Sequence, residues 1–160
     1  MPGFTTKDLE DELVPWLETL LEQVRLKDPT GELKSPKIYK HDLPVPMTDD
    51  DSELSYYPYV IIRVTGGRIS DWNADLTKAL TVQFLIGVYD NDPLRKGHDD
   101  VLNIIQRIEN KLGTTRRVNN FALGSDFQFA LGDTDTHPYY FGGIQTTFEA
   151  ARTIKEDPLA

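Results

Sequence analysis

The stretch LTVQFLIGVY, residues 80 to 89, shows the clearest alternation of apolar and polar side chains in this chain. One of its faces consists of five large apolar residues: Leu80, Val82, Phe84, Ile86 and Val88. The opposite face carries Thr81, Gln83 and Gly87. Because successive side chains of a β-strand point to opposite faces, this pattern predicts a strand. One covered and one wetter side is typical of antiparallel sheets, so we expect an antiparallel or mixed arrangement.

Four further segments fit the same sheet. YPYVIIRVTGG (57–67) predicts a long strand, and the connection over 68–78 has the length of an extended hairpin arm. NNFALGSDFQFAL (119–131) and PYYFGGIQTTFEAART (138–153) predict a second hairpin, because the GDTDTHP between them is rich in turn-forming residues. PKIYKHDL (36–43) predicts a short strand, placed at a sheet edge by its Lys residues.

The segment DNDPLRKGHDDVLNIIQRIENKLG (90–113) begins acidic and then turns apolar, which predicts the start of a packed helix. Its apolar stripe consists of Val101, Leu102, Ile105, Ile108 and Leu112. Asp99 and Asp100 fall in the first turn, where the helix dipole stabilises a carboxylate by about 0.3–1 kcal/mol. Gly113 stands where a left-handed C-cap belongs. A metal site is disfavoured, since neighbours such as His98 and Asp99 diverge by about 100° around a helix.

A second helix is predicted over TTKDLEDELVPWLETLLEQVRL, residues 5 to 26. Thr5 or Thr6 can cap it, and KDPTGE (27–32) supplies the stop. Its apolar stripe has steps of three and four residues: Leu9, Leu13, Trp16, Leu17, Leu20, Leu21 and Val24. Pro15 removes one amide donor and is expected to kink or split the helix.

These elements predict an α+β fold, with a mostly antiparallel or mixed sheet of about four to six strands and two main helices packed on one face. At 160 residues, the chain is expected to form a single domain over 1–160. We expect an ordered core over about 5–152, a mobile loop over about 44–56 and a C-terminal tail over 154–160. No apolar run approaches the roughly 20 residues of a membrane span, so a soluble intracellular protein with no membrane partner is expected.

The composition and the motifs argue against an enzymatic function and against a cofactor or metal site. The chain has no Cys, which excludes thiolate sites and disulfides. Its three His (His41, His98, His137) lie in separate segments, and no nucleophile elbow or phosphate-binding Gly loop occurs. The prediction is therefore that the protein is not an enzyme, with no catalytic residue, no cofactor and no metal site. The acidic residues Asp49, Asp50, Asp51 and Glu53 lack the spacing of a Ca²⁺ loop and predict a solvated loop.

Charge argues against nucleic acid as a partner. The formal net charge of −9 repels phosphate backbones, so sequence-specific nucleic-acid binding is not expected. The nearest basic feature is Arg116-Arg117, two residues beyond the predicted helix end. It is interpreted as a complement to the helix dipole or as part of a solvated loop.

The order of the elements resembles the tail terminator proteins of long-tailed phages and related prophages, the tail completion or minor tail protein U-like family. The resemblance covers roughly residues 5–152 and rests on YPYVIIRV, on VQFLIGVYDND running into GHDDVLNIIQRIENKL, and on YYFGGIQTTFEA. Two features weigh most, namely the strand that ends in an acidic turn and feeds the second helix, and the aromatic-rich final strand with its Gly kink. Pro15 and the acidic stretch over 48–53 have no counterpart in the family pattern.

The resemblance implies a small α/β subunit that assembles as a ring, usually a hexamer, on the top of the tail tube. Such a ring ends tube polymerisation and joins the tail to the head in the virion, after assembly in the host cytoplasm. The implied partners are other copies of the chain, the tail-tube protein and a head-completion or connector protein. Two alternatives stay open: another phage neck protein, such as a head-completion or tail-tube protein, and a small α+β ligand-binding module or enzyme.

A closed ring needs contacts between two different patches of one subunit. The candidates are the arm over 66–78, which carries Arg68 and Trp72, and an exposed strand face. That face bears Tyr59, Ile61 and Arg63, and Arg116 and Arg117 are further candidates. Six subunits would also multiply the charge of −9 sixfold, so the loop with Asp49, Asp50, Asp51 and Glu53 could face the lumen and repel DNA. An outward-facing solvated loop is the alternative.

Overall fold

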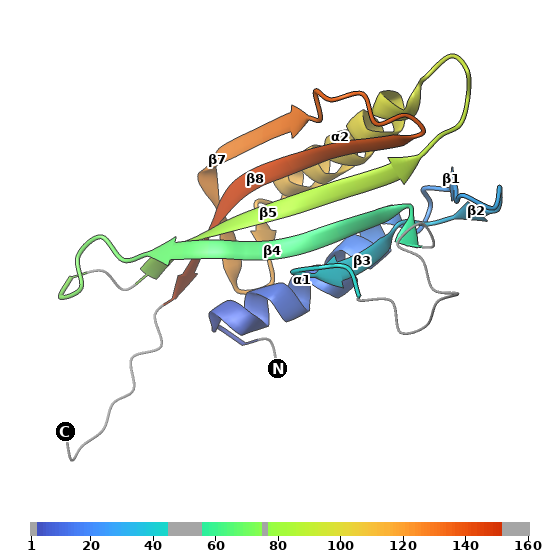
Figure 1. Cartoon of the computed structure of the whole chain (residues 1–160). Coiled ribbons are helices and arrows are strands. Elements are labelled where there is room, and N and C mark those ends of the chain that lie inside the picture. The colour runs from blue at the N-terminus through green and yellow to red at the C-terminus, as the bar shows by residue number, and fades with distance from the viewer. Residues whose placement is uncertain (1–2, 45–55, 75–76, 152–160) are drawn as a thin grey trace.

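The computed structural model describes residues 3–44, 56–74 and 77–151, shown in Figure 1. Two helices and two sheets make up this part of the chain. In chain order the elements are α1 (Thr6–Leu21), β1 (Leu26–Lys27), β2 (Leu33–Lys34), β3 (Lys37–Lys40), β4 (Tyr59–Arg68), β5 (Thr77–Tyr89), α2 (Gly97–Thr115), β6 (Arg117–Val118), β7 (Phe121–Leu131) and β8 (Tyr139–Ala151). The predicted tail over 154–160 and all but the end residues of the predicted loop over 44–56 lie outside the described residues.

The main sheet has six strands in the order β3-β4-β5-β8-β7-β6. All its neighbouring strands are antiparallel except β3 and β4, which run parallel. The predicted mixed α+β sheet is therefore confirmed, as are both hairpins and the edge position of the strand over 37–40. β5 and β8 pair along their whole lengths, from Thr77 with Ala151 to Tyr89 with Tyr139.

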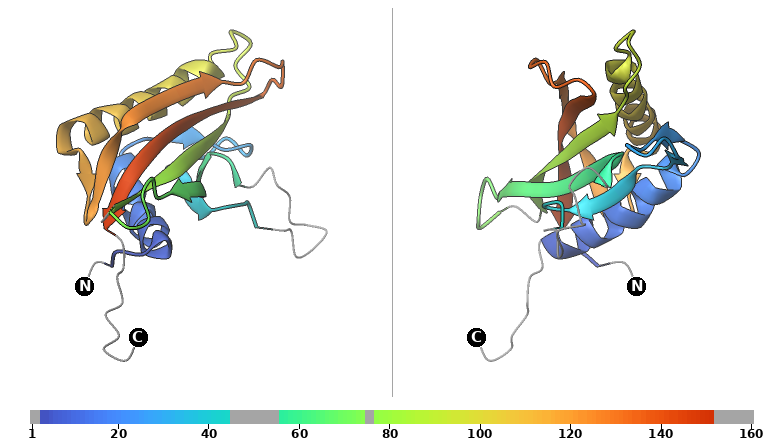
Figure 2. Two further views of the ribbon diagram at one scale, coloured as in Figure 1. Left: turned by 90° about the vertical axis from the view of Figure 1, so that its left-hand side faces the viewer. Right: turned by 45° about the vertical axis from the view of Figure 1, so that its right-hand side comes forward.

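Both helices pack on one face of this sheet, which curls around them (Figure 2). α1 contacts β3 and β4, while α2 contacts β5, β8 and β7. A single core joins the helices to the five apolar residues that the alternation of β5 placed on one face. Burying these side chains is the main favourable term that holds the two layers together.

The other face of the sheet is polar in its centre. Gln83 of β5, Gln145 of β8 and Gln128 of β7 stand side by side in register. The Gln83 Nε2 donates a hydrogen bond to the Gln145 Oε1 over 3.1 Å. The predicted division into a covered side and a wetter side is therefore confirmed for these strands.

Helix α1 begins as predicted but ends earlier. Thr5 is its N-cap and forms a capping box with Asp8, in which each side chain binds the other residue's backbone amide. The helix runs through Pro15 as one element, so the predicted split is wrong. It ends at Leu21 and not at residue 26, because Leu26 enters a two-stranded hairpin with Leu33–Lys34 that the sequence analysis missed.

That small hairpin, β1–β2, is organised by a buried carboxylate. Asp28 accepts hydrogen bonds from the amides of Thr30 and Glu32 and from the Thr30 hydroxyl. It also forms an ion pair with Lys34 at 2.7 Å. The Lys34 ammonium, followed by the Thr30 hydroxyl, holds the pKa of the Asp28 carboxyl well below its usual range.

Helix α2 differs from its prediction at its C-terminus. It continues through Gly113 to Thr115, and the left-handed C-cap residue is Arg116, with φ of 53°. The Arg116 amide donates to the Leu112 carbonyl over 2.7 Å. On its packed face Ile104 is buried and Leu102 is partly exposed, the reverse of the predicted stripe at these two positions. Burial at 101, 104, 105, 108 and 112 follows the helix period of 3.6 more closely.

Candidate functional site

The arm formed by the ends of β4 and β5 brings together two of the residues predicted to form an interface. Arg68 and Trp72 line one hollow, together with Ile69, Lys78 and Leu80. The Trp72 side chain is 69% exposed. The arm projects beyond the body of the molecule at one end of the strands (Figure 1). It therefore presents a large aromatic ring beside two cations.

The local turn of the arm is held by Asp71. Its carboxylate accepts hydrogen bonds from the amides of Asn73 and Ala74, at 3.0 and 3.3 Å. An Asp side chain that binds amides two and three residues on is a common way to fix a turn. The Lys78 ammonium donates to the Thr6 hydroxyl at 2.9 Å, which ties the base of the arm to the start of α1.

The prediction of an exposed strand face at Tyr59 and Ile61 is wrong, because these side chains are only 7% and 6% exposed. The Tyr59 ring lies over Gly87, its partner on β5, where a Cβ atom would come within 2.4 Å of the ring. Tyr57 packs on the same ring with a centroid separation of 5.0 Å. Contacts with Gly87 and Tyr57 therefore bury Tyr59, although alternation within β4 alone predicted an exposed side chain.

Arg63, the third residue of that predicted face, is engaged in holding the end of β3. Its guanidinium donates two hydrogen bonds to the His41 carbonyl, at 2.7 and 3.0 Å, and pairs with Asp42 at 3.1 Å. His41 has a positive φ of 65°, so the chain turns away from the sheet here. This geometry gives Arg63 a structural role.

Arg116 and Arg117 lie where α2 ends and β6 begins. The Arg116 carbonyl accepts a hydrogen bond from the Leu123 amide, and Arg117 opens β6. The Arg117 Nε donates to the Asn119 carbonyl at 3.1 Å. The prediction that this pair lies two residues beyond the helix is wrong, since Arg116 is itself the cap residue.

The predicted acidic loop residues Asp49, Asp50, Asp51 and Glu53 lie outside the described residues. The other acidic candidates, Asp99 and Asp100, stand in the first turn of α2 as expected. The N-cap residue, Lys96, makes no side-chain cap hydrogen bond. Burial, followed by repulsion from Asp90 and Asp99, raises the pKa of the Asp100 carboxyl. Among the described residues, no three His, Cys, Asp or Glu side chains form a group that could hold a metal ion.

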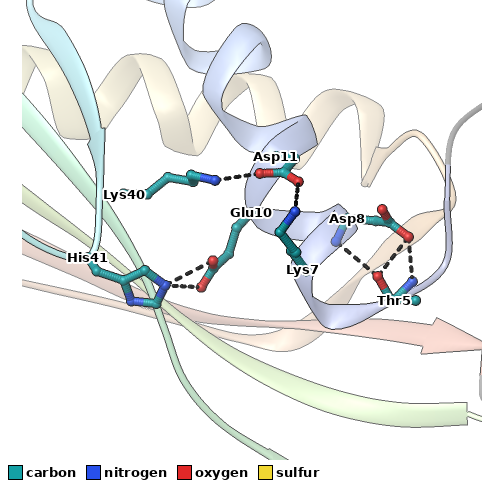
Figure 3. Close-up of polar contacts among 7 residues, drawn as sticks. All are labelled: Thr5, Lys7, Asp8, Glu10, Asp11, Lys40 and His41. Atoms are coloured by element: carbon teal, nitrogen blue, oxygen red, sulfur yellow. Dashed lines mark hydrogen bonds and ion pairs between the residues drawn. The ribbon is translucent and has the colours of Figure 1, made fainter.

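Figure 3 shows a polar seam between α1 and the edge strand β3. The His41 Nε2 lies 2.8 Å from a carboxylate oxygen of the nearly buried Glu10. Lys40 pairs with Asp11 at 2.5 Å, and Lys7 also reaches Asp11, at 3.5 Å. The Lys40 ammonium lowers the pKa of the Asp11 carboxyl, and Asp11 in turn raises the pKa of Lys40. These contacts fix β3 against the helix layer.

A second polar cluster, around Tyr140, was missed by the sequence analysis. The His137 Nδ1 lies 2.6 Å from the Tyr140 hydroxyl, and the His98 ring meets the Tyr140 ring edge-on at 5.0 Å. Arg95 pairs with Asp135 beside them. Two of the three His therefore meet at one buried ring, although they belong to separate segments. No local sequence pattern signals this cluster, because it depends on the pairing of Val88 with Tyr140, which brings β8 to the strand end that feeds α2.

Gly97 makes this approach possible. A Cβ atom at Gly97 would lie 1.9 Å from the Tyr140 ring, which is far too close for any other residue without rearrangement. The cluster thus joins the beginning of α2 to the loop between β7 and β8. These contacts give the cluster a structural role, because they hold α2 and this loop together.

Within the described part of the chain, neither helix has the length and apolar character needed to cross a membrane. Comparison of the sequence with models of known protein families gives no match, and comparison with curated proteins gives none either.

Proposed function

We propose that this chain is a structural subunit of a phage or prophage tail, which caps the tail tube as a ring, ends its polymerisation and forms the surface that joins the tail to the head. The resemblance to tail terminator proteins implies a small subunit that combines helices and strands, and this chain combines two helices with a mixed sheet. This agreement supports the proposal. In this proposed role the protein works by assembling with other subunits, and it catalyses no reaction.

The observation that carries the proposal is the arm at the end of β4 and β5. Trp and Arg are the residues most enriched where protein interfaces gain their binding energy. Trp72 and Arg68 stand together at a projecting end of the fold, with Trp72 largely exposed. A partner stacked on this end of the molecule would meet the arm first. In the proposed virion, that partner is the tail-tube protein or the connector.

Tube capping provides the direct test. The chain is mixed at increasing concentration with polymerising tail-tube protein from the same genome, and tube lengths are measured by electron microscopy. We expect shorter tubes that carry a ring at one end. We also expect a species with a mass near six times 18.2 kDa when tubes are present. Tube lengths that do not respond to the chain at any concentration would refute the proposed function.

A further inference from the structure

The outer edge of β7 is paired over only a short part of its length. β6 pairs with its beginning, Arg117 with Ala122 and Val118 with Phe121. The Leu123 amide then donates to the Arg116 carbonyl. From Gly124 to Leu131, among the residues that the structure describes, β7 has β8 on one side and no strand on the other.

The hydrogen bonds that are present show which backbone groups of β7 point outward. The Gly132 amide donates to the Phe141 carbonyl next to β8, at 2.8 Å. Amides alternate in direction along a strand, so those of Gln128 and Ala130 also face β8. The outward groups therefore belong to Phe127, Phe129 and Leu131. The side chains of these residues lie on the helix-covered face, where Phe129 is still 53% exposed.

Natural proteins usually guard such an edge with Lys, Pro or a covering segment. The residues of β7 include neither Lys nor Pro. The opposite edge of the sheet, β3, is short and has Lys at both ends, Lys37 and Lys40, so like charges disfavour its pairing with a second β3. The β7 edge thus has the properties of a surface that another strand completes.

The β3 edge has matching geometry. The amides of Lys37 and His41 donate to Pro58 and Ile62 on the side of β4, so the amides of Ile38 and Lys40 point outward. β3 runs parallel to β4, whereas β7 runs antiparallel to it. If copies stand side by side with their strands aligned, β7 of one copy meets β3 of the next as an antiparallel pair. Ile38 and Phe129 then share the helix-covered face.

The charges of the two edges are complementary. Residues 33–41 contain Lys34, Lys37 and Lys40 and no acidic residue. Residues 121–135 contain Asp126, Asp133 and Asp135 and no basic residue. Pairing of β7 with a second β7, or of β3 with a second β3, would bring like charges together, which is destabilising. Lys34, Lys40 and Asp135 are already paired within the subunit, with Asp28, Asp11 and Arg95. The charge difference between the two edges therefore rests on Lys37 against Asp126 and Asp133.

We propose that the free edge of β7 pairs with β3 of a second copy of this chain, so that the main sheet continues from one subunit to the next. This inference rests on the proposed ring, which needs contacts between two different patches. The seam in Figure 3 holds β3 against α1, and among the described residues no strand pairs with the outer edge of β3.

A backbone substitution tests the pairing. Phe129→Pro removes an outward amide and leaves the ladder with β8 intact, as proline at an edge position can do. Phe129→Thr is the matched control, because it removes the same ring but keeps the amide. On assembly with the tail-tube protein, we expect Phe129→Pro to lower the ring population at least tenfold relative to Phe129→Thr. Equal assembly of the two variants would overturn the inference.

Hydrogen exchange of the unmodified chain makes the test independent of whether Phe129→Pro folds. On assembly, the amides of Phe127, Phe129 and Leu131 should become protected, and those of Ile38 and Lys40 should become protected with them. Rings that cap tubes while these amides still exchange rapidly would overturn the edge pairing and leave the proposed function standing. Protected amides in an assembly that does not cap tubes would support the edge pairing and overturn the proposed function.

Cysteine pairing identifies the partner strand, and the chain has no Cys of its own to interfere. One variant carries Ile38→Cys, and three others carry a Cys at position 127, 129 or 131. Facing residues of an antiparallel pair lie about 4.5–5.5 Å apart at Cα, within the range of a disulfide. We expect a mixed disulfide between position 38 and one β7 position. Disulfides that form only between two β7 positions would show that the edge pairs with itself, and the inference would fall.

Discussion

The properties of individual side chains in this protein depend on the groups that they contact. Asp28 is the clearest case, since the Lys34 ammonium and the Thr30 hydroxyl stabilise its charged form. Its stabilising effect is greatest where the carboxyl is ionised in both the folded and the unfolded chain. Because the folded pKa is depressed, the contribution is present above the unfolded value of about 3.9 and is lost as the pH falls below it.

Asp28→Asn should therefore lower the free energy of unfolding at pH 7, and the difference from the unsubstituted chain should shrink at pH 3. Urea denaturation at the two pH values measures this. Glu32→Gln is the matched control, because Glu32 is an exposed carboxylate in the same turn. A difference for Asp28→Asn that does not change with pH would contradict the argument.

A second prediction at this scale concerns the core. Phe84 is fully buried between the sheet and the helices. Truncation of a buried Phe to Ala typically costs about 3–5 kcal/mol, from lost burial and from the cavity left behind. Phe84→Ala should lower the free energy of unfolding by this amount in urea denaturation. Gln83→Ala, one residue away on the polar face, should cost less than about 1 kcal/mol. Similar losses for the two variants would disprove the assignment of faces.

At the level of elements, α2 gives the sharpest difference between sequence and structure. Gly113 lies inside the helix, in open space, and Arg116 takes the left-handed conformation. Glycine in a helix interior is less stable than alanine by roughly 0.5–1 kcal/mol. Gly113→Ala should therefore stabilise the protein by about that amount, as measured by thermal or urea unfolding. If Gly113 were the left-handed cap, the same substitution would destabilise it.

Arg116→Gly is the companion variant. A residue other than glycine in the left-handed helical conformation costs roughly 1–2 kcal/mol. Replacement of Arg116 by glycine should relieve part of this cost and raise the free energy of unfolding. A loss of stability would mean that other contacts of Arg116 matter more than its backbone conformation.

The elements themselves were largely predictable because their patterns are local. The alternation of Leu80 to Val88 and the three-and-four spacing of the α1 stripe depend only on strand and helix geometry. The β1–β2 hairpin was not predictable in this way, because its two strands have two residues each. The burial of Tyr59 could not be predicted from the sequence either, since it depends on Gly87 of the neighbouring strand. The cap at Arg116 depends on the return of the chain into β6.

For the molecule as a whole, the same limit applies to the candidate site. Arg68 and Trp72 could be singled out from the sequence because the arm is one continuous segment. The free edge of β7 could not, because an edge is defined by the order of all strands in the sheet. The meeting of His98 and His137 at Tyr140 likewise requires the β5–β8 register.

The whole-molecule prediction concerns the arm. Trp72→Ala should change the free energy of unfolding by less than about 0.5 kcal/mol, because the side chain is largely exposed. It should nevertheless weaken tube capping, since exposed Trp residues at interfaces often contribute 2 kcal/mol or more to binding. Leu94→Ala is the control, since Leu94 is 70% exposed near the other end of β5. Equal tube capping by Trp72→Ala and Leu94→Ala would show that the arm is not part of the contact.

The uninterrupted pairing of β5 with β8 has a mechanical consequence for the proposed joint between tail and head. β5 runs from the arm to the turn before α2, and β8 accompanies it over the whole distance. A pull on the arm along the strand direction would load the ladder hydrogen bonds between β5 and β8 together, in shear, and would not peel them apart one after another. In the proposed assembly, tension between head and tail would thus be shared along the longest strand pair in the sheet.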